Sequence, residues 1–338
     1  MSGHLVVVVG DVINDVVVLP LEEPVASTDT ASRVRCLPGG SGANQAAWMA
    51  ALGASVRFVG RAGAPDAELH KQALASLGID ARIGVEPELP TGTIVVLVSP
   101  DGERSMFTDR GASAALGAAD LPGDLLSGAA MLHVSGYQLF GEQSRAAVRR
   151  LWDEAGEQGL ARSVDPASLS GLAAVGAEAF LRWTEGARLI FPNLDEGRFL
   201  TGEHEPEPVL EALLCHYETV VLKVGGDGVL CGSRIGGRVR LPAAVMEGAA
   251  PGIATVVDST GAGDAFLGGF VAELVGRAGA RGTSAGGTRS TSGTRSAGEV
   301  PLGASLGNTE LEGTARAGLK AAAIAVSQLG GRPPPPNV

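Results

Sequence analysis

Five short segments rich in β-branched residues, separated by Ala- and Leu-rich stretches, constrain the fold of this chain most. The segments are LVVVVG (5–10), SVRFVG (55–60), AAMLHVSG (129–136), ARLIFPN (187–193) and TVVLKVGG (219–226). Each is apolar enough to be buried on both faces of a sheet. The stretches between them have helical spacing, at 42–52, 65–77, 142–156, 207–217 and 262–275. This alternation predicts a three-layer α/β domain with a mainly parallel central sheet.

Two regions interrupt the alternation, because each contains two strand-like runs with no helix between them. The first holds VINDVVVL (12–19) and RVRCL (33–37), and the second holds TIVVLVS (93–99) and RSMFT (104–108). Asp101-Gly102 favours a tight hairpin turn in the second region. We therefore expect a small β-sheet lid formed from two insertions, at about 12–37 and 91–112. Its strand edge would be exposed, and a homodimer through the lid is a hypothesis that would cover it.

Composition limits the class of protein. The chain has 338 residues, of which 45% are hydrophobic, so a single domain over 1–338 with a large core is expected. A net charge of −11 argues against nucleic acid as a partner. Three dispersed cysteines and the absence of a long apolar run predict a cytoplasmic protein with no membrane partner. Residues 276–298, rich in Gly, Ser, Thr and Arg, are expected to form a flexible low-complexity insertion.

The stretch DSTGAGDAFLGGF (258–270) combines a glycine turn, an acid and an apolar run with helical spacing. Backbone N–H groups of such a turn, at a helix N-terminus, point to a position where negative charge can lie. A carboxylate at Asp264 would then stand beside a transferred phosphoryl group, where an attacking hydroxyl must lose its proton. The alternative is that Asp264 only caps its helix. This stretch alone leaves the two readings level.

A second glycine cluster, PGGSGANQAAWMAALG (38–53), permits close backbone approach and offers Asn44 as donor and acceptor to a polyol. This cluster with its continuation to 63, together with DSTGAGDAFLGGF, resembles the two signatures of the PfkB family of carbohydrate kinases. The resemblance covers residues 5 to about 275 and resumes at 315–331. It implies a ribokinase-like fold and ATP-dependent phosphorylation of a hydroxymethyl group of a sugar, with a small-molecule sugar or sugar-like substrate.

The resemblance also implies roles for particular residues on the phosphate side. Asp264 matches the catalytic base, and the matching anion hole is Gly261, Ala262 and Gly263. FPNLDE resembles the family's N-x-x-E motif, in which Asn193 and Glu196 help place magnesium and the triphosphate, with Glu196 acting directly or through water. KVGGDG resembles the nucleotide loop, so the residues expected to line the ATP site are Lys223, Gly225 and Gly228.

On the acceptor side, the resemblance implies sugar-hydroxyl contacts from Asp15 and from the substrate loop, at Gly40 and Asn44. Arg110 resembles a lid-side arginine, with a surface salt bridge as the alternative. Asp11 is ranked below Asp15, as a structural residue. Asp258 resembles an acid that helps form a monovalent-cation site in some members, which makes potassium a further candidate ion. The C-terminal GGRPPPP stands where relatives complete that site with a small hydroxyl residue.

Two other functions stay open. A nucleoside kinase similar to adenosine kinase would need aromatic stacking surfaces on the lid, for which Phe107 is the main candidate. A non-catalytic ligand-binding sensor would have no need of the base. The full set of Asp264, Asn193 and Glu196 favours an enzyme.

Overall fold

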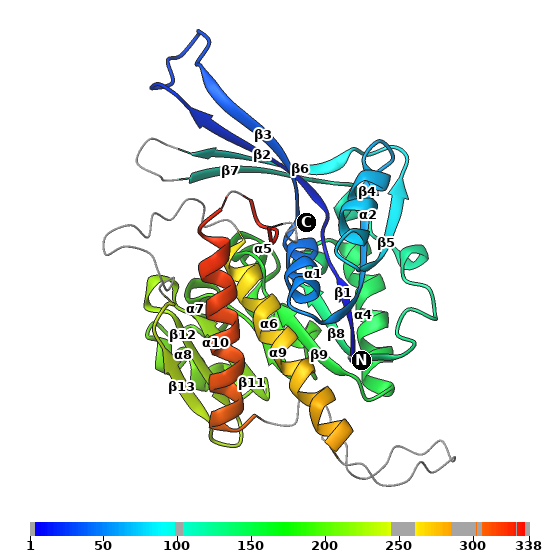
Figure 1. Cartoon of the computed structure of the whole chain (residues 1–338), viewed down its shortest axis with the longest axis vertical. Helices are drawn as coiled ribbons and strands as arrows, with labels where there is room; N and C mark the ends of the chain where they lie inside the picture. Colours follow the sequence, from blue (N-terminus) through cyan, green and yellow to red (C-terminus); the bar gives the residue numbers. More distant parts are fainter. Residues whose placement is uncertain are drawn as a thin grey trace.

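The computed structural model describes residues 4–98, 104–244, 261–284, 302, 306–328 and 330–334. Within them, nine of the strands form one large sheet, in the order β13-β12-β11-β10-β9-β8-β1-β4-β5 (Figure 1). The strands are β1 (Leu5–Val9), β4 (Ser55–Gly63), β5 (Asp80–Glu86), β8 (Ala129–Ser135), β9 (Ala161–Asp165), β10 (Leu189–Ile190), β11 (Thr219–Lys223), β12 (Val229–Ser233) and β13 (Arg238–Leu241). Every pairing from β11 to β5 is parallel, whereas β12 and β13 pair antiparallel at one edge.

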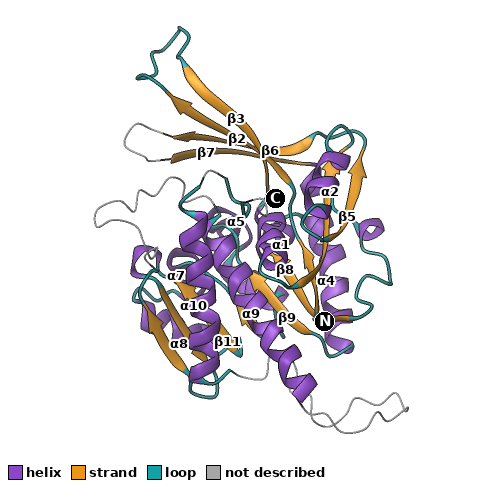
Figure 2. Ribbon diagram, in the orientation of Figure 1, coloured by secondary structure: helices purple, strands orange, loops and turns teal. Residues whose placement is uncertain are grey.

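Helices cover both faces of this sheet, which confirms the predicted α/β class (Figure 2). They are α1 (Ser41–Ala51), α2 (Ala67–Ala75), α3 (Tyr137–Phe140), α4 (Glu142–Glu157), α5 (Leu169–Val175), α6 (Ala177–Trp183), α7 (Leu194–Thr201), α8 (Pro206–Leu214), α9 (Ala262–Ser284) and α10 (Asn308–Ala325). Because side chains alternate along a strand, Val6 and Val8 of β1 enter a core with α1, α9 and α10. Val7 and Val9 enter the opposite core, with α4 and α8.

A separate four-stranded sheet stands away from the main body (Figure 1). Its strands are β2 (Ile13–Pro20), β3 (Ser32–Gly39), β6 (Thr91–Val98) and β7 (Arg104–Gly111), in the order β3-β2-β6-β7. These strands come from the two regions in which paired strands were predicted. The expected Asp101-Gly102 turn lies outside the described residues.

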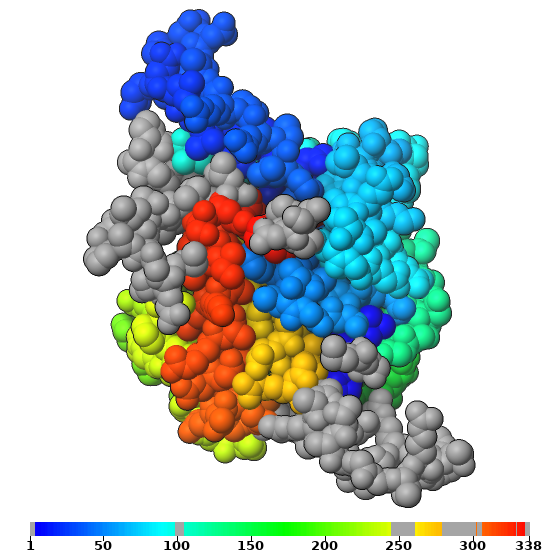
Figure 3. Space-filling view, viewed as in Figure 1, coloured from blue at the N-terminus to red at the C-terminus, as the bar shows by residue number. Residues whose placement is uncertain are grey.

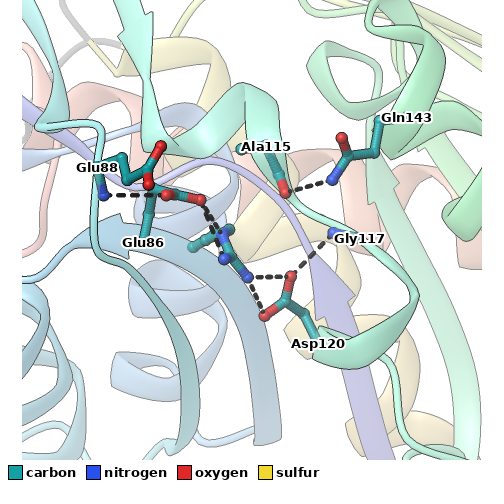
Figure 4. A network of polar contacts seen from close by, with 7 residues as sticks. Glu86, Glu88, Ala115, Gly117, Asp120 and Gln143 are labelled. Atoms are coloured by element: carbon teal, nitrogen blue, oxygen red, sulfur yellow. Dashed lines mark hydrogen bonds and ion pairs between the residues drawn. The ribbon is translucent and has the colours of Figure 1, made fainter.

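An ion-pair cluster joins the main sheet to the segment that follows β7, the last strand of the small sheet. Arg61 of β4 contacts Glu86 of β5 at 3.0 Å and Asp120 at 2.9 Å. Asp120, in a short 3-10 turn after β7, also accepts the backbone N–H of Gly117 (Figure 4). The Asp120 side chain is 6% exposed, so this pair is shielded from water and holds the chain where it re-enters the main domain.

Helix α9 corrects one expectation, because residues 276–284 continue the helix rather than beginning a loop. Arg277 pairs with Glu273 one turn earlier, and its guanidinium packs over Gly313 of α10. The contact of Arg277 with α10 stabilises the helix just past the predicted start of the loop. Residues 285–298 lie outside the described residues.

Candidate functional site

Polar and charged residues lie at the carboxyl ends of neighbouring parallel strands. Asp11 follows β1, Asp165 ends β9, Asn193 follows β10 and Lys223 ends β11. Parallel strands bring these ends to one edge of the sheet, which is where open α/β sheets bind ligands. Helix α9 begins at the same edge, since the Lys223 Nζ atom lies 3.4 Å from the position that a Cβ on Gly263 would take.

Asp264, in the first turn of α9, accepts hydrogen bonds from three side chains of α1. Ser41 Oγ donates to its Oδ1 at 2.7 Å, Gln45 Nε2 to the same oxygen at 3.0 Å, and Asn44 Nδ2 to Oδ2 at 3.3 Å. The carboxylate is thus oriented by another helix instead of capping its own. The two glycine motifs, more than 200 residues apart in the sequence, form one site.

A chain of buried hydrogen bonds fixes the orientation of the Gln45 side chain on the side away from Asp264. Its Oε1 lies 2.9 Å from His133 Nε2, and His133 Nδ1 lies 2.8 Å from Ser163 Oγ. Burial and the nearby Lys223 lower the pKa of His133 to about 3, so its ring is neutral. A neutral ring that donates from Nε2 and accepts at Nδ1 fits both contacts. The Gln45 amide nitrogen is thereby directed to Asp264 and, at 2.9 Å, to Asp165.

The pKa of Asp264 is raised to about 7. Burial is the largest cause and the negative charge of Asp165 is the next, while Ser41, Lys223 and Asn44 act in the opposite direction. A carboxyl group with a pKa near neutrality accepts a proton more readily than an ordinary aspartate.

Lys223 places a positive charge among three acids. Its Nζ lies 3.2 Å from Asp165 Oδ1. Burial opposes its charge, yet Asp165, Glu196 and Asp264 raise the pKa of Lys223 above its usual value. The ammonium group is therefore charged and lies beside the glycine turn that begins α9.

Asn193 and Glu196 form a reciprocal cap at the N-terminus of α7. Asn193 Oδ1 accepts the backbone N–H of Glu196, and Glu196 Oε2 accepts the backbone N–H of Asn193, each at 2.8 Å. Burial and the charge of Asp165 raise the pKa of Glu196 to about 7, against the effect of Lys223.

The donor set fits a magnesium ion held mainly by a phosphate ligand. Within the described ranges, no group of three or more His, Cys, Asp or Glu side chains could enclose a metal. Magnesium usually keeps several waters and takes one or two carboxylates besides substrate phosphates. Glu196 is a carboxylate at this edge of the sheet that could serve in this way, directly or through water.

Glycine is required in the two turns expected to face the nucleotide. Gly261 has a φ of 76°, and a Cβ there would overlap Gly331. Gly228 has a φ of 94°, and a Cβ there would overlap the Leu241 carbonyl. Gly225 has a φ of 61° with no described atom within 4 Å of its Cβ position, so its backbone faces open space.

On the acceptor side, β2 and β3 bring Asp15 to the start of α1. The Asp15 carboxylate occupies the space where Gly39 would carry a Cβ. Gly40 has a φ of 97° and its Cβ position lies 2.5 Å from the Asp11 carbonyl. Asn44 is 3% exposed, and its Oδ1 has no hydrogen-bond partner in the part of the chain that the structure describes. That oxygen is available to a hydroxyl donor.

Asp11 holds the same helix start from the other side. Its carboxylate accepts the backbone N–H groups of Ser41 and Gly42, at 3.0 and 3.1 Å. These contacts agree with the structural role expected for Asp11.

The Arg110 guanidinium of β7 lies 4.0 Å above the ring of Tyr137 in α3. Burial and the charges of Asp11, Asp264 and Asp165 raise the pKa of Tyr137 to about 12, while Arg110 lowers it. Arg110 thus stacks on an aromatic ring near the acids of the site. The alternative prediction for Arg110 was a surface salt bridge. The expected cation-site residue Asp258 lies outside the described residues.

The sequence reasoning missed five side chains of this site: Ser41, Gln45, His133, Tyr137 and Asp165. Asp165 could have been found as an acid that ends a strand, but ARSVD is too short and polar to indicate a buried strand. Gln45 lay within the quoted GANQ motif without an assigned role. His133 lies inside an apolar strand, where a histidine carries no functional signal.

Comparisons of sequence and structure relate this chain to known proteins. The model of the pfkB family carbohydrate kinases matches residues 4–337. Fructokinase-1 of Oryza sativa subsp. japonica is 30% identical over 289 residues, covering 81% of this chain and 85% of the relative.

Two solved structures share the fold at low sequence identity. Adenosine kinase from Sinorhizobium meliloti superposes with a TM-score of 0.77 at 21% identity, covering 98% of this chain and 96% of that chain. An E. coli protein described as a candidate ribokinase II, solved with ATP and Mg2+, has a TM-score of 0.75 at 20% identity, covering 97% and 94%.

Proposed function

The chain belongs to the pfkB family of carbohydrate kinases and is an ATP-dependent sugar kinase, and we propose that Asp264 is the base that deprotonates the hydroxymethyl group of its acceptor. The observation that carries this proposal is the position of Asp264. It stands in the first turn of α9, oriented by Ser41, Asn44 and Gln45, with its pKa raised to about 7. A base with a pKa near the working pH combines a sufficient ionised fraction with useful basicity.

The backbone N–H groups of Gly261, Ala262 and Gly263 form the proposed anion hole. They lie at the N-terminus of α9, where unpaired N–H groups and the helix dipole favour negative charge on a transferred phosphoryl group. Lys223 adds a positive charge beside Gly263. These groups stabilise charge that builds up as the phosphoryl group moves to the acceptor.

ATP is proposed to lie over Gly225 and Gly228, with Glu196 and Asn193 near its phosphates. Magnesium bound at Glu196, directly or through water, would neutralise phosphate charge. An E. coli structural neighbour was solved with ATP and Mg2+, which supports these two ligands for the proposed site. Potassium is not part of the proposal, because Asp258 lies outside the described residues.

The acceptor is proposed to lie between the small sheet and α1, in contact with Asp15, Gly40, Asn44 and Arg110. The small sheet would act as a lid that excludes water and so limits ATP hydrolysis.

Exposed apolar side chains on this sheet suit a homodimer: Val34, Met106 and Phe107 are 57%, 55% and 62% exposed. Sedimentation that shows only monomer would refute the dimer.

A sugar is preferred to a nucleoside as the acceptor. Phe107, the aromatic residue that a nucleoside would need, lies on the opposite face of β7 from Arg110, since the two are three residues apart on a regular strand. The fold shared with adenosine kinase keeps a nucleoside as the second candidate.

The test is turnover of magnesium–ATP against ribose, fructose, 2-keto-3-deoxygluconate, adenosine, cytidine and inosine, with Asp264→Asn as the paired variant. One strong acceptor should emerge, and the variant should bind ATP normally yet lose at least about a thousandfold in kcat. Near-normal turnover by Asp264→Asn would refute the base assignment. A folded, ATP-binding protein that accepts nothing would instead favour a sensor.

A further inference from the structure

The segment Gly330–Arg332 lies between three parts of the proposed site. Trp48 Nε1 of α1 donates to the Gly331 carbonyl at 2.9 Å. A Cβ on Gly331 would overlap the Asn44 amide, and a Cβ on Gly261 would overlap Gly331. Figure 3 shows the red C-terminal residues next to the blue strands of the small sheet. This segment therefore touches both the acceptor asparagine and the proposed anion-hole turn.

Arg332 extends from this segment to the small sheet. Its Nη2 approaches the Gly39 carbonyl at 3.5 Å, and the charge of Asp15 acts on it. Its main-chain carbonyl is held by Gln328 Nε2 at 2.7 Å. The Nε atom is buried with no hydrogen-bond partner among the residues that the structure describes. A buried guanidinium N–H without a partner is costly, so its position favours a ligand oxygen.

The register of the small sheet places Gly39, whose carbonyl Arg332 approaches, and Arg110 at opposite ends of one row. Gly39 pairs with Ile13, Ile13 pairs with Gly92, and the β6–β7 register sets Gly92 opposite Arg110. At about 4.8 Å between strands, the row spans roughly 14 Å. The two middle members are Ile13, whose side chain is fully buried, and Gly92, whose Cβ position is occupied by the Ile13 Cδ1 atom.

Asp15 and Arg110 share one face of this sheet. Asp15 is two residues from Ile13 on β2, so its side chain lies on the face that the Gly39–Arg110 row presents. That face looks toward the main domain, because Arg110 stacks on Tyr137 there. Arg110 Nη2, like Arg332 Nε, is buried without a hydrogen-bond partner in the described ranges.

We propose that Arg332 is an acceptor-binding, specificity-determining residue, which donates a hydrogen bond to a sugar oxygen other than the one that is phosphorylated. The Arg332 guanidinium approaches the Gly39 carbonyl and lies within the electrostatic influence of Asp15, and no interaction with Asp264 is found among the described residues, so Arg332 would contact a part of the sugar away from the reacting hydroxyl. Arginine is donor-only and selects an acceptor oxygen at that position. The inference rests on the proposed sugar kinase function and adds a residue from outside the family motifs.

The experiment uses the full chain with saturating magnesium–ATP and the acceptor that the panel identifies. Arg332→Ala should raise the KM for that acceptor about tenfold or more, with the KM for ATP and the melting temperature little changed. Arg332→Lys should recover part of the loss, since it keeps the charge beside Asp15. Arg316→Ala is the matched control, because Arg316 is an exposed arginine of α10 paired only with Glu312 among its described contacts.

A series of monodeoxy analogues of the acceptor separates binding from a structural role. The wild-type protein should discriminate against the analogue that lacks the hydroxyl facing Arg332, and Arg332→Ala should lose that discrimination alone. Equal discrimination by both proteins, or a fall in melting temperature with both KM values raised, would overturn the inference while the kinase function stands. A wild-type protein that phosphorylates no member of the panel would overturn the proposed function and the inference with it.

Discussion

Replacing Asp165 with asparagine should move the acid limb of the pH–rate profile to lower pH. Asp264 must be ionised to act as a base, and its pKa is raised to about 7, first by burial and then by Asp165. Wild-type activity should therefore fall as the pH drops below 7. At pH 6, a group with a pKa of 7 is ionised to only about 9%.

The size of the shift follows from the shared contact with Gln45. Asp165 Oδ2 and Asp264 Oδ1 each lie within 3.0 Å of the Gln45 amide nitrogen, so they are at most about 6 Å apart. At an effective dielectric constant of about 20, their repulsion is roughly 2.8 kcal/mol, or about two pKa units. Screening by water and by Lys223 reduces this to about one unit. The loss of Asp165 also leaves Lys223 freer to stabilise the Asp264 anion.

The assay is kcat/KM for the acceptor from pH 5 to 9 at saturating magnesium–ATP, with each protein scaled to its own maximum. At pH 6, Asp165→Asn should retain about half of its maximum where the wild-type protein retains about a tenth. Asp153→Asn, which removes an exposed acid of α4, is the control. An acid limb that stays at 7 or moves upward would refute the electrostatic reasoning. If Glu196→Gln abolishes the acid limb, that limb reports the ionisation of Glu196, whose pKa is also raised to about 7.

Three further predictions concern the supporting residues. Gln45→Leu should raise the pKa of Asp264 and move the acid limb to higher pH, because the ionised carboxylate loses a hydrogen bond. The same pH series measures this shift. An unchanged acid limb would show that the Gln45 contact does not stabilise the ionised carboxylate. Gly40→Ala should cost about 1–3 kcal/mol in urea unfolding, since alanine is strained at a φ of 97° and would crowd the Asp11 carbonyl. Asp120→Ala should cost about 2–3 kcal/mol in the same assay by leaving Arg61 only Glu86, and a loss below about 0.5 kcal/mol would place this pair among ordinary surface pairs.

Much of the fold could be predicted because it depends on local patterns. Apolar β-branched runs alternating with helical spacing predicted the parallel sheet, and paired strands without helices predicted the small sheet. Strands β5, β9, β12 and β13 were not predicted. Strand β9 contains Arg162 and Ser163, and β5 contains Asp80 and Arg82, so their polar residues hide the strand pattern that the sheet imposes by pairing.

The sequence by itself was enough to identify the two glycine motifs and Asp264, which follows the second glycine turn, and hence the family. Those features depend on backbone conformation and on residue type within one short segment. Tertiary structure decided which side chains meet. Only the fold brings Gln45, Asp165 and Asp264 together from three distant segments, and only the fold sets Arg332 beside Asp15. The pKa of Asp264 belongs to this second kind, because burial and neighbouring charges depend on distances in space that sequence spacing does not contain.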